Sequence, residues 1–188
     1  MNANSEYEAL RKELSEISAR QFNLVTFSVT ASGALLAVAV EQKQPLVALI
    51  PLLILWFCGG VYINHAYATM RIATYIRNFH ESSNPALCWE TYMQKLRDHQ
   101  AKTKGTILSW PTYEDLLIAS GTVAIIVALM LAFQVSSTPA TLIIIGMMAL
   151  IWIIFAWRIQ HAARRATTGE LDRVYDALWK TLCENRST

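Results

Sequence analysis

The stretch LLIASGTVAIIVALMLAFQVSSTPATLIIIGMMALIWIIFAW, residues 116–157, decides the fold of this chain. Its 42 residues include no Asp, Glu, Lys, Arg or His. Because about 20 apolar residues cross the hydrocarbon core of a bilayer, the run is too long for one span. The polar break at 134–139 (QVSSTP) divides it into two parts. The pattern predicts a membrane hairpin with spans at 116–133 and 140–157.

The first half of the chain predicts a second hairpin of the same kind. Two apolar segments, 23–40 and 46–68, flank the short polar turn EQKQP at 41–45. The sequence AVA at 37–39 is similar to a signal-peptide cleavage site. However, the preceding segment is rich in glutamate, whereas a signal peptide begins with a short basic region. We therefore expect a retained anchor and an all-α membrane protein of four spans.

Lysine and arginine are distributed unevenly, and their distribution predicts the orientation in the membrane. Segments 1–20, 71–115 and 158–188 hold 3 + 6 + 6 = 15 of the 16 Lys and Arg residues. Basic segments stay on the cytoplasmic side of a membrane. We therefore expect a multi-pass protein of the cell inner membrane with both termini in the cytoplasm. The net charge of +2 gives no reason to expect direct binding of nucleic acid.

The whole chain, 1–188, is predicted to be one membrane domain with three helical segments in the cytoplasm, at 1–22, 69–110 and 158–188. In the first segment, apolar residues share one helical stripe. Packing on the protein's own helices is the favoured interpretation of this stripe, and a coiled coil between protomers is the alternative. The stripe consists of Tyr7, Leu10, Leu14, Ile17, Gln21 and Leu24.

The ends of several helices are predicted from local signals. Ser5 with Glu8, and Thr167 with Glu170, have the spacing of capping boxes. Pro51 in the second span predicts a kink, because proline removes a helical hydrogen bond. After Glu170, a second apolar stripe follows. The acidic residues between its members are expected on solvated faces, as are Glu90, Asp98 and Glu170. The stripe is Leu171, Val174, Leu178 and Leu182, and the acidic residues are Asp172 and Asp176.

Two spans carry stripes of small or weakly polar residues. Such residues let membrane helices approach closely and form hydrogen bonds with each other. The first stripe is Asn23, Thr26, Thr30 and Gly33, and the second is Ser120, Ala124, Ala128 and Ala132. We interpret both as helix-packing faces, with the lining of a pore as the alternative for the first. Together with the four-span layout, they predict a homo-oligomer.

Short matches between the two halves predict an internal duplication. Ala31-Ser-Gly33 matches Ala119-Ser-Gly121, and a Trp precedes a His-Ala pair by nine residues in each half. The landmarks of the returning helices are thus Trp56 with His65, and Trp152 with His161. Asn64 and His65 lie where the second span is expected to reach the membrane interface. A satisfied polar group is the favoured interpretation of His65, and a proton relay is the alternative.

Sequence features of common catalytic sites are absent. The chain contains no Gly-rich phosphate loop, no H-E-x-x-H and no G-x-S-x-G motif. Its three cysteines are far apart and have no metal-binding spacing. The predicted spans also lack Asp, Glu, Lys and Arg, which charge-coupled transport normally requires. We therefore expect neither an enzyme nor a cofactor.

In size and layout, the whole chain resembles the four-span inner-membrane effectors of bacterial phage-defence and abortive-infection systems. That resemblance implies an effector that changes membrane permeability when a cytosolic protein partner or signal acts on it. It implies no individual functional residue. A membrane anchor that recruits a soluble partner, and a channel or transporter subunit, are the alternative functions.

Overall fold

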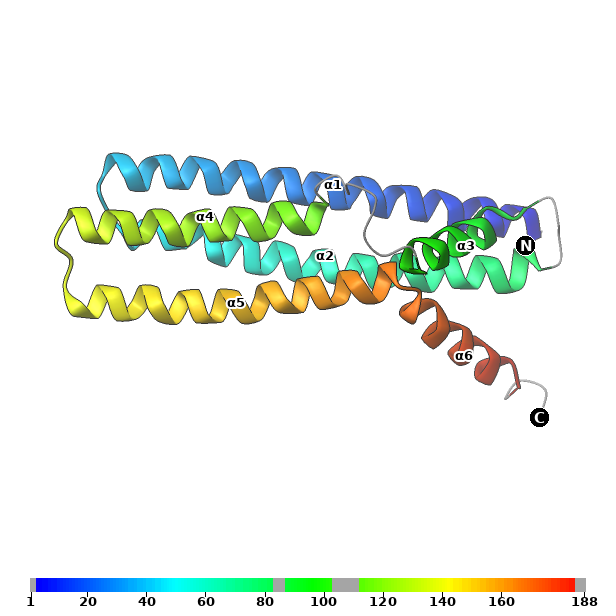
Figure 1. Cartoon of the computed structure of the whole chain (residues 1–188). Coiled ribbons are helices and arrows are strands. Elements are labelled where there is room, and N and C mark those ends of the chain that lie inside the picture. Colours follow the sequence, from blue (N-terminus) through cyan, green and yellow to red (C-terminus); the bar gives the residue numbers. More distant parts are fainter. Residues whose placement is uncertain (1–2, 83–86, 103–111, 185–188) are drawn as a thin grey trace. The chain divides into compact units, whose positions relative to one another are not determined.

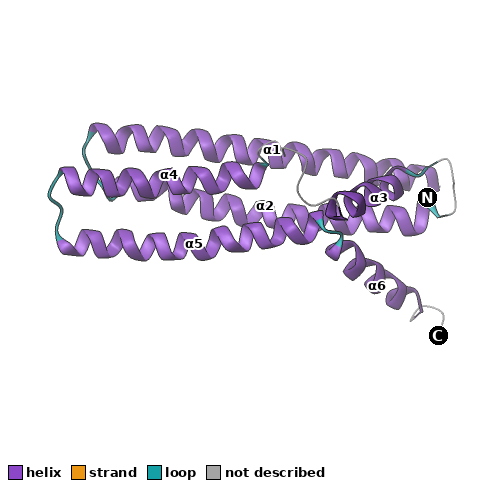
Figure 2. Ribbon diagram, viewed as in Figure 1, coloured by secondary structure: helices purple, strands orange, loops and turns teal. Residues whose placement is uncertain are grey.

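A computed structural model describes residues 3–82, 87–102 and 112–184, and within these residues the chain is helical and contains no strand (Figure 2). The predicted all-α fold is therefore confirmed. Parts of the predicted segment 69–110, namely 83–86 and 103–110, lie outside the described residues. The elements in chain order are α1 (Ala3–Glu41), the 3-10 turn η1 (Val47–Leu49), α2 (Ile50–Tyr75), the π-helical stretch η2 (Ile76–Glu81), α3 (Trp89–Lys102), α4 (Tyr113–Gln134), α5 (Pro139–Thr167) and α6 (Glu170–Glu184).

Among the described residues, four helical segments are long and apolar enough to cross a membrane. They are contained in α1, in the run from η1 through η2, in α4 and in α5. Each contains one predicted span, so the prediction of four spans is confirmed by length and composition. The predicted boundary between residues 22 and 23 is not a break, because α1 continues through it. Likewise, α5 continues past Trp157 to Thr167.

The chain divides into two compact units (Figure 1). Unit 1 comprises Met1–Arg20, Ile63–Leu108 and Ala162–Thr188, and unit 2 comprises Gln21–Tyr62 and Ser109–His161. Unit 2 includes only two of the chain's 16 Lys and Arg residues, Lys43 and Arg158. The division thus separates an apolar unit that holds most of the predicted spans from a unit rich in charge.

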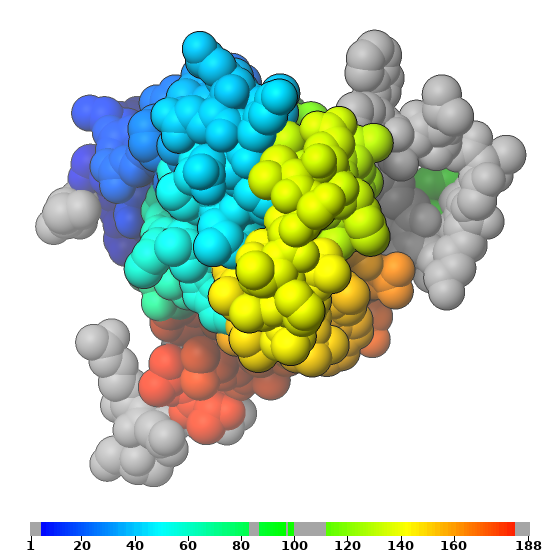
Figure 3. Space-filling view, turned by 90° about the vertical axis from the view of Figure 1, so that its left-hand side faces the viewer, coloured from blue at the N-terminus to red at the C-terminus, as the bar shows by residue number. Residues whose placement is uncertain are grey.

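Unit 2 contains the predicted hairpin 116–157 and all of the predicted hairpin 23–68 except residues 63–68. The turn between α1 and η1 and the turn between α4 and α5 lie side by side at one end of the unit, in cyan and yellow in Figure 3. Lys43 and Ser136 occupy the left-handed region in these turns, with φ of 52° and 49°. A reversal within so few residues requires such a conformation, which is uncommon outside glycine.

Two glycines of unit 2 receive the bulky side chains of α5. The Trp152 ring lies directly over Gly121 of α4, and a Cβ atom at that glycine would be 2.1 Å from Trp152 Cζ2. The Phe155 ring lies over Gly59 of α2, where a Cβ atom would be 2.7 Å from Phe155 Cζ. Because carbon atoms pack at about 3.5–4.0 Å, neither position has room for a side chain. Helix α5 therefore approaches α2 closely at Gly59.

The small-residue stripe of α4 packs inside the chain. Ala124, Ala128 and Ala132 are buried, whereas Ser120 is half-buried and donates a hydrogen bond to the Leu116 carbonyl. Helix α4 lies against η1. The stripe is therefore a packing face within one chain, as small residues on membrane helices commonly are, and it is not a free face for assembly.

The polar stripe of α1 has the opposite environment. Its four members, Asn23, Thr26, Thr30 and Gly33, are exposed on the chain. The face of α1 that packs in unit 2 is instead marked by Val25, Ser28, Ser32 and Ala39. Packing of the predicted stripe within the chain is thus excluded in this structure. Packing against another copy, or contact with water in a pore, stays a prediction.

Unit 1 has an apolar core in which α1 packs on α2 and η2. Leu14 and Ile17 are buried against Ile72 and Ile76. Tyr7, Leu10 and Ala68 pack around them. The favoured interpretation of the N-terminal stripe, packing on the protein's own helices, is confirmed.

Two predicted helix caps are wrong, and Pro51 lies near the beginning of its helix. Helix α1 begins at Ala3, so Ser5 does not cap it. Thr167 ends α5 and donates its hydroxyl back to the Ala163 carbonyl, while Gly169, at φ of 71°, makes the break before α6. Pro51 is the second residue of α2, where its missing N–H has no helical partner to lose.

Candidate functional site

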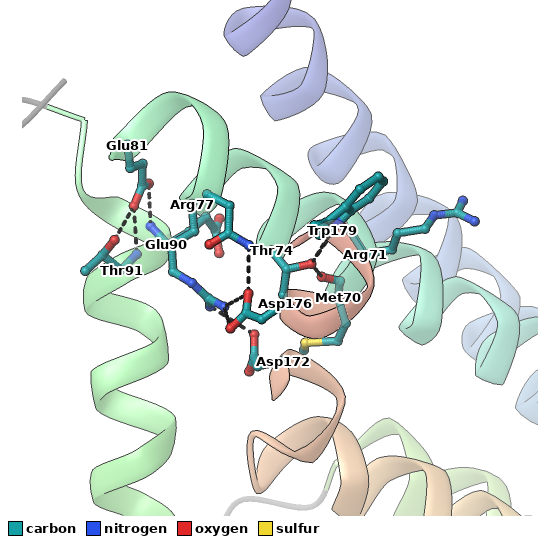
Figure 4. A network of polar contacts seen from close by, with 11 residues as sticks. Met70, Arg71, Thr74, Arg77, Glu81, Glu90, Thr91, Asp172, Asp176 and Trp179 are labelled. Carbon is teal, nitrogen blue, oxygen red and sulfur yellow. Dashed lines mark hydrogen bonds and ion pairs between the residues drawn. The ribbon is translucent and has the colours of Figure 1, made fainter. Parts of the chain in front are cut away.

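Unit 1 contains a network of buried charges, centred on Arg77 near the start of η2 (Figure 4). Its guanidinium donates from Nη1 to Asp172 Oδ1 at 3.1 Å, and from Nη2 to both oxygens of Asp176 at 2.6 and 2.7 Å. Asp172 is 0% exposed, and Arg77 is also buried. Both aspartates lie on α6, one helical turn apart. Arg77 therefore binds α6 through two charged hydrogen-bonding partners, the strong kind of side-chain contact.

Neighbouring residues extend this attachment along both helices. Asn78 Nδ2 donates to Asp176 Oδ1 at 2.8 Å. One turn further along α6, Trp179 Nε1 donates to Thr74 Oγ1 at 3.3 Å, and the indole ring packs edge-on against Tyr75. Because these contacts run over about two turns of α6, they fix its rotation about its own axis as well as its position.

Glu81, at the end of η2, holds the beginning of α3. Its Oε1 accepts from the backbone N–H of Glu90 at 2.7 Å, and its Oε2 accepts from the N–H and the hydroxyl of Thr91. A carboxylate at a helix N-terminus satisfies N–H groups that have no partner within the helix, and it is favoured by the helix dipole. Glu81 is buried, so this cap is shielded from solvent.

A second ion pair connects α3 with α1. Arg11 Nη1 lies 2.7 Å from Glu90 Oε1, and Glu90 is buried. The Arg11 guanidinium also lies over the Trp89 ring, 5.7 Å from its centroid. Thus buried or half-buried charges join α1 to α3, α3 to η2, and η2 to α6. We refer to these two ion-pair groups and the Glu81 cap as the charge network.

The charge network is suited to holding helices and unsuited to acid–base chemistry. Removing one partner of a buried ion pair costs about 3–5 kcal/mol, because the other charge is left buried and unpaired. The carboxylates of Asp172 and Asp176 are occupied by Arg77 and Asn78. An attachment of this kind favours one arrangement of α6, and it can be changed by any partner that competes for the same charges.

The prediction of solvated acidic faces is wrong for Glu90 and Asp172, which are buried, and for Asp176, which is half-buried. The charge network was therefore missed. A signal for it is present, because polar residues recur on one face of η2 and α2 and again on one face of α6. These residues are Thr74, Arg77, Asn78 and Glu81, and Asp172, Asp176 and Trp179.

As a result, α6 presents its predicted apolar stripe outward. Leu171 is buried, but Val174, Leu178 and Leu182 are each about half exposed, at 49%, 46% and 49%. The helix thus turns Asp172, Asp176 and Trp179 to the protein and most of its apolar stripe away, whereas a helix on a protein surface usually buries its apolar face.

The predicted landmarks of the two halves lie in different environments. Trp56 is exposed and stacks on Phe155 with ring centroids 4.8 Å apart, whereas Trp152 is buried. His65 is half-buried, and its Nδ1 has no hydrogen-bond partner among the described residues, whereas His161 is exposed and lies near Trp157. Asn64 is exposed. The order of elements agrees with a duplication, but the environments differ, so the duplication stays a prediction.

At the beginning of α4, a local network satisfies the exposed backbone donors. Thr112 and Asp115 form a reciprocal capping box, and Glu114 accepts a hydrogen bond of 2.7 Å from the Tyr62 hydroxyl of α2. Glu114 and Asp115 lie in the first turn of α4, where their negative charge is favoured by the helix dipole. The Tyr62 contact, which joins residues far apart in the sequence, was not predicted.

No protein-family model, no curated protein and no solved structure matches this chain. Its function is therefore argued from its own residues.

Proposed function

We propose that this chain is a small oligomeric protein of the inner membrane, an effector that changes membrane permeability when a cytosolic partner or signal acts on unit 1. In this proposal, unit 2 lies in the lipid bilayer and unit 1 lies in the cytoplasm with both termini. The basic residues concentrated in unit 1 support this orientation.

The observation that carries the proposal is the exposed polar stripe of α1. Asn23, Thr26, Thr30 and Gly33 point away from the packed face of their own helix within a predicted span. In hydrocarbon, polar side chains gain from contact with another helix or with water. In an assembled state, a second copy of the chain covers the polar stripe. In a conducting state, the stripe lines a water-filled path between copies.

The charge network supports a switch in unit 1. Arg77 follows directly on α2, the helix that contains the second predicted span, and α6 follows α5, which contains the fourth. A partner that competes with Arg77 for Asp172 and Asp176 changes the attachment between the extensions of these two spans. The resemblance in layout to four-span phage-defence effectors is consistent with this mode of action.

The proposal is tested by following membrane potential with a voltage-sensitive dye after induced expression in bacteria. Expression together with the neighbouring genes should depolarise the cells. The double variant Thr26→Val and Thr30→Val keeps the side-chain shape and removes both hydroxyls, so it should abolish the signal. Thr122→Val is the matched control, because Thr122 is an exposed threonine of another predicted span.

Membrane insertion of every variant must be checked by fractionation. A flat dye signal from inserted wild-type protein, even with the neighbouring genes present, would refute the effector function. Equal depolarisation by the double variant and by Thr122→Val would show that the polar stripe has no part in permeability.

A second candidate function, an anchor that recruits a soluble protein, is favoured by the exposed apolar residues of unit 1. In addition to the outward stripe of α6, Trp89, Tyr92 and Leu96 are exposed on α3. Exposed apolar patches commonly mark interaction sites. An anchor leaves the membrane potential unchanged, so the same dye experiment separates the two functions.

A further inference from the structure

An apolar groove of about 310 Å³ lies in unit 2 between α2 and α5. It is lined by apolar and aromatic side chains, among them Leu52, Leu53, Trp56, Phe57, Met148 and Ile151. Leu53 and Phe57 are 56% and 75% exposed, so the groove is open at the surface of the unit. Because its residues belong to two predicted spans, the groove opens into lipid when unit 2 lies in a bilayer. An acyl chain then fills it, since an empty groove loses packing contacts.

The groove alone does not select one lipid, because all lipid tails are as apolar as its walls. Arg158 of α5 adds a charge near by. It is exposed, forms no ion pair among the described residues, and follows directly on the predicted span 140–157. The neighbouring Trp157 is 63% exposed, as is typical of tryptophan at a membrane interface.

The depth and the side of α5 both bring Arg158 into line with the groove. At about 1.5 Å per residue, Ile151 and Met148 lie about 10–15 Å from Arg158 along the helix. The hydrocarbon of one leaflet is about 15 Å thick, so an acyl chain reaches the groove from a head group at Arg158. Ile151 precedes Arg158 by two helical turns and therefore lies on the same side of α5.

On α2, Gly60 leaves open space beside the groove. It follows the groove residue Trp56 by about one turn, and a Cβ atom at Gly60 would meet nothing within 4 Å. The preceding residue, Gly59, lies against Ile159 of α5, so Gly60 is at the level of Arg158. The step from the groove to the arginine is thus open on the α2 side.

The carboxylates of unit 2 do not supply a partner for Arg158. They are Glu41, Glu114 and Asp115. Glu114 accepts a hydrogen bond from Tyr62, and Asp115 caps α4. Glu41 ends α1, at the turn at the opposite end of the unit. Unit 2 of a second copy therefore brings no free carboxylate to this level, whereas a phospholipid has a chain for the groove and a phosphate for the arginine.

We infer that unit 2 binds an anionic phospholipid, with an acyl chain in the groove and the phosphate on Arg158. An exposed arginine without a carboxylate partner favours a head group with net negative charge. Phosphatidylglycerol should therefore bind in preference to phosphatidylcholine. The inference rests on the placement of unit 2 in the bilayer, and it goes beyond the proposed function because it holds whether or not the protein changes membrane permeability.

The test is a native mass spectrometry titration of the purified full-length chain in detergent micelles. The probes are phosphatidylglycerol and phosphatidylcholine with identical acyl chains. We expect the wild type to bind phosphatidylglycerol more tightly. Arg158→Gln should bind phosphatidylglycerol about fivefold more weakly and phosphatidylcholine unchanged, so the preference is lost. Arg158→Lys keeps the charge and should retain most of the preference.

A second variant tests the groove separately from the charge. Leu53→Trp fills part of the groove, so it should weaken binding of both lipids without changing the ratio of their affinities. Leu150→Trp is its matched control, because Leu150 is 59% exposed on α5 and does not line the groove. Lys43→Gln is the matched control for Arg158→Gln, because Lys43 is the other basic residue of unit 2. Both controls should bind as the wild type does, and circular dichroism confirms that each variant is folded.

Four results would overturn the inference. Equal wild-type affinity for the two lipids would show that no head group is selected. An unchanged preference in Arg158→Gln would place the phosphate elsewhere, and unchanged affinities in Leu53→Trp would place the chain elsewhere. Displacement of phosphatidylglycerol by an equal concentration of glycerol 3-phosphate, which has no chain, would show that the site binds phosphate alone. None of these results depends on membrane potential, so failure here is distinguishable from failure of the proposed function.

Discussion

Replacing Gly121 with alanine places a methyl group where the Trp152 ring already lies. The new Cβ atom would be 2.1 Å from Cζ2 and 2.4 Å from Cε2 of that ring. Carbon atoms in contact are about 3.5–4.0 Å apart, so the ring or the helix must move by about 1.5 Å. Both atoms belong to the fused ring system, which cannot bend away as a flexible chain end can.

The cost follows from two opposing contributions. Overpacking of a well-packed interior costs about 1–3 kcal/mol. Alanine is a better helix former than glycine by about 1 kcal/mol, which offsets part of this cost. Gly146→Ala on α5 is the matched control, because a Cβ atom there meets nothing within 4 Å. We therefore expect Gly121→Ala to be less stable than Gly146→Ala by about 1–3 kcal/mol.

This difference in stability is measured by unfolding each purified variant in mixed micelles with increasing amounts of a denaturing detergent. Far-ultraviolet circular dichroism is the readout. Combining Gly121→Ala with Trp152→Leu should make the alanine much less costly, because the smaller side chain leaves room for the methyl group. Equal unfolding midpoints for Gly121→Ala and Gly146→Ala would refute the close contact between α4 and α5.

Three further predictions concern other contacts of the two units. Gly59→Ala should be less stable than Gly60→Ala by about 1–3 kcal/mol, because a Cβ atom at position 59 meets Phe155 whereas one at position 60 meets open space; the same detergent titration compares them. Arg77→Met removes the cation that pairs with the buried Asp172 carboxylate, at a cost of about 3–5 kcal/mol, and should increase hydrogen exchange in α6. Arg173→Met changes an exposed arginine of α6, so its exchange should stay within error of the wild type, and similar exchange in both variants would contradict the buried network. Thr112→Ala removes the cap of α4 and should cost about 1 kcal/mol, with faster hydrogen exchange in the first turn of α4; unchanged exchange there would show that the cap contributes little.

The membrane-spanning part of the fold could be predicted from the sequence because its signal is strong and local. A run such as 116–157 has no ionisable residues, so its helices are expected in a lipid bilayer and not in water. The buried alanines of α4 were also predictable, since small residues at every fourth position form a smooth face. The partner of that face was not predictable, because Trp152 lies on the next helix and nothing local pairs it with Gly121.

The charge network could not be predicted in the same way. Arg77 and Asp172 are 95 residues apart in the chain. Helical periodicity shows that Asp172 and Asp176 share a face, but it does not show which face meets the protein. The usual expectation, that the apolar face is buried, therefore gave the wrong side of α6. The same limit applies to α1, where Thr26 and Thr30 share a face that the structure leaves exposed.

The reversed orientation of α6 has a thermodynamic consequence. Release of a helix that is docked by its apolar face exposes that face to water and raises the heat capacity. In α6, Val174, Leu178 and Leu182 are already exposed, and much of the docked surface consists of charged and polar groups. Its release is therefore accompanied by a smaller change in heat capacity than the release of a helix docked by its apolar face, and it depends on ionic strength to the extent that salt reaches the ion pairs. The attachment of α6 responds to charge more than to temperature.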